Sequence, residues 1–316
     1  MRERRYNSFA SFVERRFNGK KLHKVNIDAG FTCPNRDGTV GYGGCIYCNN
    51  ASFRPSSCKP TLSITEQVEN GIEYLKLRYG AEIFLAYFQP YTNTYAPLPV
   101  LEGYYREALS NPSVVGLAIG TRPDCVDEEK VALLEELSRH HFILIEYGLQ
   151  SIYEKSLQFI NRGHDYKCFL DALALTSGRG IHIGAHIIAG FPTETREETL
   201  RMAEVLSELE IGFLKLHQLQ VVKDTKLARI YEEAPFHVFG YEEYVEFAAD
   251  FLERLSPDIV LQRLFATAPD EILIAPQWGA NKHRILRDIE SEFYRRDTRQ
   301  GRPYKAKASV PSPDRV

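Results

Sequence analysis

The sequence has no long apolar run. A helix that spans a bilayer needs roughly 18 to 20 consecutive apolar residues, and no stretch of the 316 residues approaches that length. The first 17 residues, MRERRYNSFASFVERRF, are basic and aromatic but have no continuous apolar segment, so they do not predict a secretory signal peptide. We therefore expect a cytoplasmic protein that has no membrane partner.

Cysteine is too scarce for a disulfide framework. The chain has six cysteines, and Cys33, Cys45 and Cys48 fall within 16 residues. A secreted disulfide-rich domain would be much shorter and much denser in cysteine, so a metal or redox site in a reducing compartment is the better interpretation. The three remaining cysteines are scattered and are expected to be small buried hydrophobic residues: Cys58, Cys125 and Cys168.

The net charge of −3 hides two basic ends on an acidic body. Residues 1–24 hold eight Lys or Arg and two acids, a net of +6, and residues 282–307 hold nine Lys or Arg and four acids, a net of +5. Such ends can bind a polyanion, with Arg295, Arg296 and Arg299 as candidate phosphate contacts. Charge patterning alone equally allows solubilising, partly disordered termini.

Six short apolar runs alternate with longer amphipathic stretches. β-Branched and aromatic residues are concentrated in the runs 22–28, 83–88, 114–119, 142–148, 181–188 and 213–219. Helical patterns lie near 65–79, 98–110, 127–140, 151–177 and 195–210. This alternation indicates parallel strands joined by right-handed helical crossovers, and runs that are apolar on both faces predict a sheet covered by helices.

Polar, glycine-rich clusters follow nearly every predicted strand. They occupy 30–33, 89–95, 120–124, 148–151, 190–194 and 217–220. In a parallel barrel these positions form the loops of the C-terminal face, where active sites lie. Six units predict a partial, open (β/α)6 barrel. An open doubly wound sheet is the alternative, and it would place its ligands at the same end.

The α/β rhythm loosens past residue 220. Helical patterns near 241–255 and 281–297 flank one more strand-like run over 258–264. We expect three regions along the chain, which are a basic N-terminal segment over 1–21, the (β/α)6 core over 22–220, and a C-terminal helical and strand extension with a basic tail over 221–316.

The cysteine triplet Cys33-x11-Cys45-x2-Cys48 follows the first predicted strand in a loop with five glycines. Thiolates are the ligands that favour iron–sulfur clusters or zinc. A closed zinc site needs a fourth ligand, and neither Cys58 nor His23 is well placed for it. Three cysteines leave one iron of a [4Fe–4S] cluster open to a chelating cofactor. Tyr47 is placed to cover that cluster or to contact the cofactor.

A triplet ending in Cys-x-aromatic-Cys after strand one of a β/α chain resembles the radical S-adenosylmethionine (SAM) superfamily. The common spacing there is Cys-x3-Cys-x2-Cys. The eleven-residue gap resembles instead the radical SAM domain of the Elongator catalytic subunit and a bacterial group called YtqA/YhcC. Motifs along nearly the whole chain look like that bacterial group, at 28–35, 89–97, 120–124, 147–151, 161–164, 217–219, 278–282 and 300–301.

The resemblance implies a radical SAM barrel with SAM bound beside a [4Fe–4S] cluster on the three cysteines. Gln150 and Arg162 have the spacing of a common superfamily pair, so Arg162 is expected to bind the methionyl carboxylate and Gln150 the ribose. The Gly190 turn would meet adenine. Many relatives bind the methionyl amine through a Gly-Gly-Glu that this chain lacks, so Asn93 or backbone carbonyls would substitute. His186 replaces an acid found on strand five of relatives.

The resemblance also implies a reaction. Superfamily members reduce SAM with an electron from a donor such as flavodoxin or ferredoxin, and the resulting radical abstracts hydrogen from the substrate. Arg122, Lys215 and His217 stand at predicted strand ends as candidate substrate anchors, with buried ion pairing as the alternative.

For the substrate, kinship with Elongator implies a wobble uridine in tRNA, whose carboxymethylaminomethyl group would be processed to aminomethyl. Two alternatives stay open from the sequence. One is a radical SAM enzyme that acts on a small metabolite. The other is a non-catalytic iron–sulfur or zinc protein that binds RNA.

Overall fold

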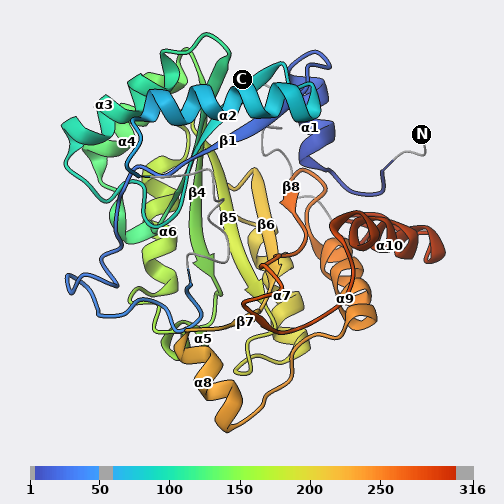
Figure 1. Cartoon of the computed structure of the whole chain (residues 1–316). Helices are drawn as coiled ribbons and strands as arrows, with labels where there is room; N and C mark the ends of the chain where they lie inside the picture. Colours follow the sequence, from blue (N-terminus) through green and yellow to red (C-terminus); the bar gives the residue numbers. More distant parts are fainter. Residues whose placement is uncertain (1–3, 50–59, 304–316) are drawn as a thin grey trace.

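Seven parallel strands form one curved sheet in the computed structural model, which describes residues 4–49 and 60–303 (Figure 1). Six of them follow in chain order, namely β1 (Leu22–Ile27), β2 (Ile83–Phe88), β3 (Val114–Thr121), β4 (Phe142–Gln150), β5 (His182–Ala189) and β6 (Phe213–Gln218). The seventh, β8 (Val260–Arg263), pairs in parallel with β6. The predicted partial α/β barrel is confirmed, and the C-terminal region adds a strand to its sheet.

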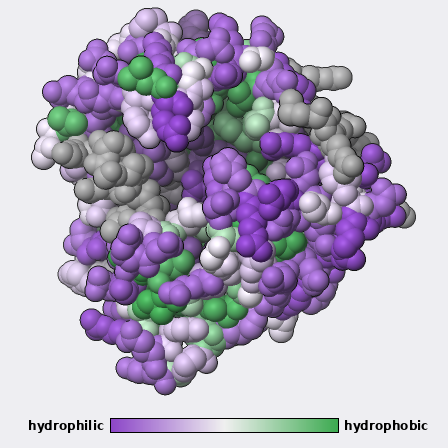
Figure 2. Space-filling model, turned by 45° about the vertical axis from the view of Figure 1, so that its right-hand side comes forward, coloured by the Kyte–Doolittle hydropathy of each residue, from purple (hydrophilic) through white to green (hydrophobic). Residues whose placement is uncertain are grey.

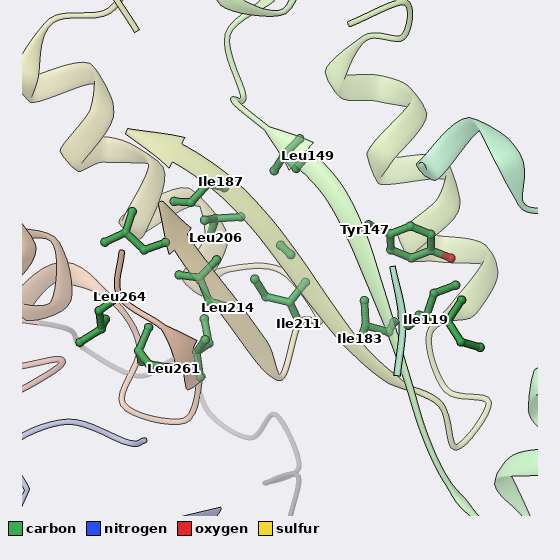
Figure 3. Close-up of a cluster of buried hydrophobic side chains, with 14 of the residues drawn as sticks. Ile119, Tyr147, Leu149, Ile183, Ile187, Leu206, Ile211, Leu214, Leu261 and Leu264 are labelled. Carbon is green, nitrogen blue, oxygen red and sulfur yellow. The ribbon is translucent and has the colours of Figure 1, made fainter. Parts of the chain in front are cut away.

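Helices cover the outer face of the sheet, as the doubly apolar strands require. They are α2 (Ile64–Tyr79), α3 (Leu98–Leu109), α4 (Glu128–Ser138), α5 (Glu154–Phe159), α6 (Tyr166–Thr176) and α7 (Arg196–Ser207). The main hydrophobic core lies between these layers, where Ile183, Leu214 and Leu261 come from three neighbouring strands (Figure 3). All six side chains of β2 are buried because helices lie on one side and the barrel interior on the other.

The predicted helix over 151–177 is two helices. Asn161 and Gly163 have positive φ angles of 52° and 75°, which an α-helix does not accommodate. The chain therefore leaves α5 and begins again at α6, whose N-cap is Asp165. This break has a functional consequence, because it holds Arg162 in the loop between the helices.

The N-terminal segment closes the end of the barrel at which the strands begin, at the top of Figure 1. Its helix α1 (Phe9–Arg16) inserts Phe12, which has no exposed surface, among aromatic rings of the strands. The Phe12 ring lies 5.0 Å from that of Phe213 and 5.9 Å from that of Phe142, measured between centroids. Backbone pairing between Ser8 and Leu261 ties the segment to β8. Residues 6–16 thus belong to the folded body.

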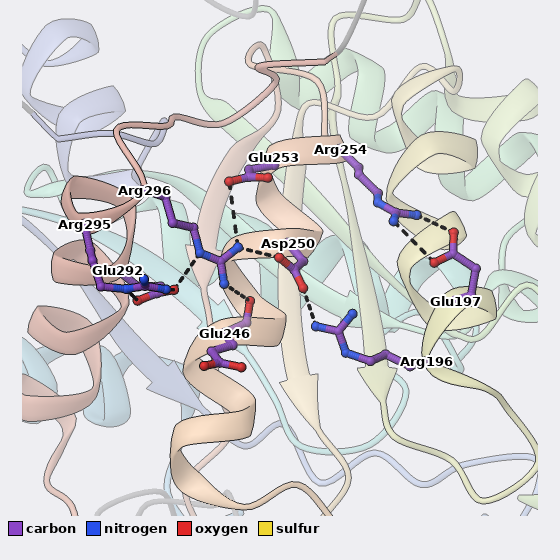
Figure 4. A network of polar contacts seen from close by, with 9 residues as sticks. All are labelled: Arg196, Glu197, Glu246, Asp250, Glu253, Arg254, Glu292, Arg295 and Arg296. Atoms are coloured by element: carbon purple, nitrogen blue, oxygen red, sulfur yellow. Dashed lines mark hydrogen bonds and ion pairs between the residues drawn. The ribbon is translucent and has the colours of Figure 1, made fainter.

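The C-terminal region contains α8 (Lys226–Glu233), α9 (Tyr241–Arg254), α10 (Lys282–Arg295) and a two-stranded sheet of β7 (Val221–Val222) and β9 (Leu273–Ala275). Ion pairs join α9 to its neighbours α7 and α10 (Figure 4). Arg296 pairs with Asp250, and Arg295 pairs with Glu292 at 2.6 Å. The domain boundary predicted at residue 221 stays a prediction. Strand β8 lies beyond that residue and yet belongs to the sheet of the core.

The two basic ends of the chain meet in space. Arg5 forms an ion pair with Asp297 at 3.1 Å, and the rings of Tyr6 and Phe293 lie 6.3 Å apart. Much of the face shown in Figure 2 is hydrophilic, with apolar side chains gathered in small patches. Within 4–49 and 60–303, no helix has the length and apolar character needed to cross a membrane.

Replacement of Phe12 by Ala should destabilise the protein by about 3–5 kcal/mol, because a fully buried ring would leave a cavity at the base of the barrel. Leu77→Ala is the control, since Leu77 on α2 is 83% exposed and its loss should change the free energy of unfolding by less than about 0.5 kcal/mol. Urea unfolding of the cluster-free proteins measures both values. Equal, small effects of the two substitutions would show that α1 does not close the barrel.

Candidate active site

A cavity opens at the carboxyl ends of the parallel strands, where sequence analysis places the active site. Its walls come from the loop after β1, from the ends of β2 to β6 and from the segment after β8. In residue numbers, the lining draws on 33–48, 87–93, 120–122, 146–150, 162, 186–188, 215–222 and 263–267. Segments more than 200 residues apart in the sequence thus face one space.

The three cysteines of the triplet line one wall of this cavity. Cys45 is buried, and Cys33 and Cys48 are partly exposed. The turn before Cys45 needs glycine, because Gly43 and Gly44 have φ angles of 78° and 81°. Short hydrogen bonds then fix the loop against the break between α5 and α6.

Two asparagines make those bonds. The side-chain amide of Asn35 donates to the carbonyl oxygen of Asn161 at 2.6 Å, and Asn161 donates back to the carbonyl oxygen of Gly44 at 3.0 Å. The cysteine loop is therefore held by contacts to a segment more than 110 residues away.

The three thiols are the candidate ligands of a [4Fe–4S] cluster, which binds each thiolate at a different iron. In the described parts of the chain, no three His, Cys, Asp or Glu side chains are grouped so that they could hold one metal ion. Burial and the neighbouring Cys45 raise the pKa of the Cys48 thiol to about 12. Metal binding here must therefore displace a proton.

Two of the other three cysteines, Cys125 and Cys168, do not line the cavity. Cys125 is buried beside β3, as predicted, and Cys168 is half-buried on α6. Cys58 lies outside the described residues.

Arg162 and Gln150 converge on the cavity beside the cysteines. The guanidinium of Arg162 donates to the carbonyl oxygen of Gly148 at 2.6 Å and contacts the sulfur of Cys45 at 3.6 Å, while its Nε is buried without a partner. A Cβ atom on Gly148 would lie 2.7 Å from the side-chain nitrogens of both residues, so a larger residue there would shift the ends of these two side chains. Gln150 adopts a φ of 72°, which is strained for a residue with a side chain.

Asn93 offers a hydrogen-bond acceptor that complements the donor of Arg162. It is 1% exposed, its amide donates to the carbonyl oxygens of Gly120 at 2.9 Å and Pro90 at 3.1 Å, and its Oδ1 is buried without a partner. The cavity thus holds an unpartnered acceptor at Asn93 and an unpartnered donor at Arg162. An amino acid moiety, with one ammonium and one carboxylate, fits such a pair.

The other predicted cofactor residues differ in position. Tyr47 lies against Cys45, and burial together with that thiol raises the pKa of its phenol. His186 lines the cavity on β5. Gly190 does not line it, and a Cβ atom there would lie 2.8 Å from the ring of Phe239.

Of the predicted substrate anchors, Arg122 is engaged in an ion pair. It is 2% exposed, binds both carboxylate oxygens of Asp124 at 2.8 and 2.7 Å, and donates to the carbonyl oxygen of Arg162 at 2.9 Å. This is the ion-pair alternative that the sequence left open. This contact positions Arg162, which in turn contacts Cys45. Arg122 therefore supports indirectly the cavity wall that carries the three cysteines, which we call the cysteine wall.

Lys215 and His217 lie deeper, beside a carboxylate that sequence analysis missed. Glu146 has no exposed surface and accepts hydrogen bonds from Lys215 at 2.5 Å and Lys24 at 2.9 Å. The signal was present in the sequence, because an acid in the middle of the apolar run FILIEYG must have buried partners. Lys215 also donates to the Tyr87 hydroxyl at 2.8 Å.

The half-barrel, the cysteine wall and the unpartnered groups beside it define an iron–sulfur protein with a cavity for a polar cofactor. The chain belongs to the radical SAM superfamily, whose family model matches residues 33–206, and a model of the radical SAM C-terminal domain matches residues 211–295. Members of this superfamily use a [4Fe–4S] cluster and SAM. Both cofactors predicted from the sequence are therefore confirmed.

Relatives place the chain within the superfamily. It is 33% identical to the uncharacterized protein YtqA of Bacillus subtilis (strain 168), over 95% of this chain and 93% of YtqA. It is 37% identical to protein YhcC of Escherichia coli (strain K12), over 87% of this chain and 88% of YhcC. The resemblance to the YtqA/YhcC group is confirmed.

More distant similarities extend to Elongator proteins. A tRNA uridine(34) acetyltransferase of Methanocaldococcus jannaschii is 26% identical over 42% of this chain and 24% of that protein. The structure of N-terminally deleted Elp3 from Methanocaldococcus infernus covers 93% of this chain and 70% of its own, with a TM-score of 0.67 and 17% identity. That structural likeness concerns the fold.

Replacement of Cys33, Cys45 or Cys48 by Ala should abolish the cluster, because each would remove one of three iron ligands. Cys168→Ala is the matched control and should keep it, since Cys168 lies away from the cavity. Iron content and the visible absorption of anaerobically reconstituted protein measure the outcome, with about one cluster expected per wild-type chain. Tight zinc without iron would contradict the cluster assignment.

Proposed function

We propose that this radical SAM enzyme modifies the C5 side chain of a wobble uridine in tRNA, converting carboxymethylaminomethyl to aminomethyl. The observation that carries the proposal is the similarity to an enzyme whose name specifies tRNA uridine 34, within the same superfamily. The match covers only 24% of that protein, so its acetyltransferase activity is not part of the proposal. When bound, the cluster and SAM would supply one-electron chemistry that removes hydrogen from an unactivated carbon, with the electron taken from a donor such as flavodoxin or ferredoxin. The conversion balances if the carbon next to the carboxylate loses one hydrogen atom and then one electron, with SAM as the overall oxidant. Water would then hydrolyse the resulting imine, so that the two-carbon group leaves as glyoxylate and the aminomethyl group remains.

The residues beside the cysteines bind SAM in this proposal. Arg162 holds the methionyl carboxylate through the part of its guanidinium that the protein leaves unpaired, and Asn93 Oδ1 accepts from the methionyl ammonium. Gln150 reaches the ribose from its strained turn, and Tyr47 covers the cluster side of the site. His186 lines the same cavity and completes this cofactor site. Gly190, which the sequence placed against adenine, lies outside the cavity lining and has no role in the proposal.

The surface formed by the two basic ends supports binding of tRNA. Lys21 of the N-terminal segment and Lys282 of α10 both lie close enough to His23 for their charges to lower its pKa, after the effect of burial. Lys20, Lys282 and Arg299 are exposed and make no ion pair with another described residue. Arg295 and Arg296 already pair with acids of the chain, so they are poor candidates for phosphate contacts.

Arg162→Ala should weaken SAM binding at least about tenfold, because hydrogen bonds to a charged group contribute about 1.5–3 kcal/mol each. The cluster absorption should persist, since the three cysteines remain. Arg139→Ala, an exposed arginine at the end of α4, should bind SAM normally. Calorimetric titration of the reconstituted proteins compares them. An unchanged affinity in Arg162→Ala would mean that another residue holds the carboxylate.

Affinity for tRNA should fall linearly with salt concentration on logarithmic axes, because phosphate contacts release counterions. The triple variant Lys20→Glu, Lys282→Glu and Arg299→Glu should reduce the slope by roughly one unit per lost contact. A control triple variant carries Glu at the exposed cations of the outer helices, Arg139, Lys167 and Arg201, and should keep the wild-type slope.

Mass spectrometry of tRNA nucleosides from a deletion strain tests the substrate directly. The proposal expects carboxymethylaminomethyluridine to accumulate and aminomethyluridine derivatives to disappear. Normal tRNA modification in that strain, together with no tRNA binding by the protein, would favour an enzyme that acts on a small metabolite.

A further inference from the structure

The charges that line the cavity are strongly unequal. In the part of the chain that the structure describes, five cationic side chains face one carboxylate, namely Arg36, Arg122, Arg162, Lys215 and Arg263 against Glu146. Cations in a concave, partly buried space attract anions, so the position of each cation indicates where an anionic group belongs. The five fall into two groups, one at the cysteine wall and one on the cavity floor.

The cysteine-wall group has partners within the protein. Arg162 contacts the sulfur of Cys45, Arg122 pairs with Asp124, and the charge of Arg36 favours the thiolate of Cys48. When the thiols ligate iron they become thiolates, which adds negative charge at this wall. These three arginines are therefore accounted for by the metal and cofactor site.

The positive charges of the floor group are not matched by negative charges of the protein in the same way. Among the described residues, Glu146 is the only carboxylate of this group. It is shared by Lys24, Lys215 and the imidazole of His186 at 2.9, 2.5 and 3.3 Å. Burial lowers the pKa of His186 to about 4, so this ring is neutral at pH 7 and adds no charge. Lys24 and Lys215 thus share one carboxylate as their ion-pair partner. Arg263 is close enough for its charge to act on Lys215.

Arg263 and two nitrogen atoms near it have no partner among the residues that the structure describes. Arg263 is exposed on the cavity wall and makes no ion pair with another described residue. His217 Nε2 and Gln262 Nε2 are buried without any hydrogen-bond partner. Burial, and then the charges of Lys24 and Arg263, lower the pKa of Lys215 although Glu146 acts in the opposite direction. A floor with excess positive charge and free polar atoms is completed by a ligand that is anionic and accepts hydrogen bonds.

We propose that Lys215, His217 and Arg263, which all line the cavity, form a subsite for the terminal carboxylate of the substrate. Arg263 offers the planar, paired N–H donors that match a carboxylate, and Lys215 offers a point charge. This inference rests on the proposed function, in which the uridine side chain enters this same cavity. The subsite extends from Arg263 on the exposed cavity wall to the buried Lys215. It therefore suits the end of a side chain that enters the cavity rather than a backbone phosphate of tRNA.

The subsite also accounts for discrimination between substrate and product. A carboxymethylaminomethyl group ends in a carboxylate, which the floor attracts. The aminomethyl product ends in a cation, which Lys215 and Arg263 repel. Loss of the carboxylate therefore weakens binding at the floor, and the product leaves.

N-acetylglycine is the probe for the subsite, because it carries a carboxylate but no nucleic acid. Holoprotein with labelled histidine imidazoles is titrated by NMR with N-acetylglycine, and in parallel with N-acetylglycinamide, at constant ionic strength. We expect the acid, and not the amide, to shift imidazole resonances in a saturable way. Arg263→Gln should bind the acid at least tenfold more weakly, and Arg139→Gln should bind it normally.

Equal binding of acid and amide, or undiminished binding of the acid by Arg263→Gln, overturns the subsite. A second measurement compares the affinity for tRNA carrying carboxymethylaminomethyluridine with that for tRNA carrying aminomethyluridine. Wild-type protein should prefer the first at least tenfold, and Arg263→Gln should lose the preference. If the probe result holds while wild-type protein does not distinguish the two tRNAs, the wobble-uridine substrate is wrong and the carboxylate subsite stands.

Discussion

A single buried carboxylate organises the interior of this protein. Glu146 sits in the middle of β4 with no exposed surface, and its ion pairs reach Lys24 on β1 and Lys215 on β6. Lys24 also donates to Gln262 of β8 at 2.6 Å, so the two edge strands of the open sheet are linked across the interior. Removing one partner of a buried ion pair typically costs about 3–5 kcal/mol, because the other charge is left alone. The curvature of the sheet and the floor of the cavity both depend on these contacts.

The cavity next to Glu146 has two regions with different side chains. One wall carries three cysteines in a glycine-rich loop, and the break between α5 and α6 holds that loop and presents Arg162 to it. The opposite region is the floor, where lysine, arginine and neutral imidazoles gather. A cofactor at the wall and a substrate group on the floor would therefore meet within one cavity. The aromatic rings of α1 and the strands fill the opposite end of the barrel.

Nucleic-acid binding would use a different part of the molecule. The basic ends lie together on the N-terminal segment and α10, and the ion pairs of α7, α9 and α10 neutralise some of their arginines (Figure 4). The number of free cations is therefore smaller than the sequence indicates. A large polyanion held at this surface and a small anionic group held at the cavity floor are separate requirements, and each has its own residues.

The sequence by itself determined the elements that depend on local pattern, namely the six core strands, the helices that cover them and the cysteine triplet. It also indicated that Gln150 and Arg162 act as a pair. In the structure the side chains of both residues lie close to Gly148. It did not disclose that β8 completes the sheet, that the helix over 151–177 is broken, or that Glu146 meets Lys24 from 122 residues away. Periodicity reports how a segment buries its own side chains. Which charges meet inside the barrel depends on strand order and register, and only the tertiary structure decided these.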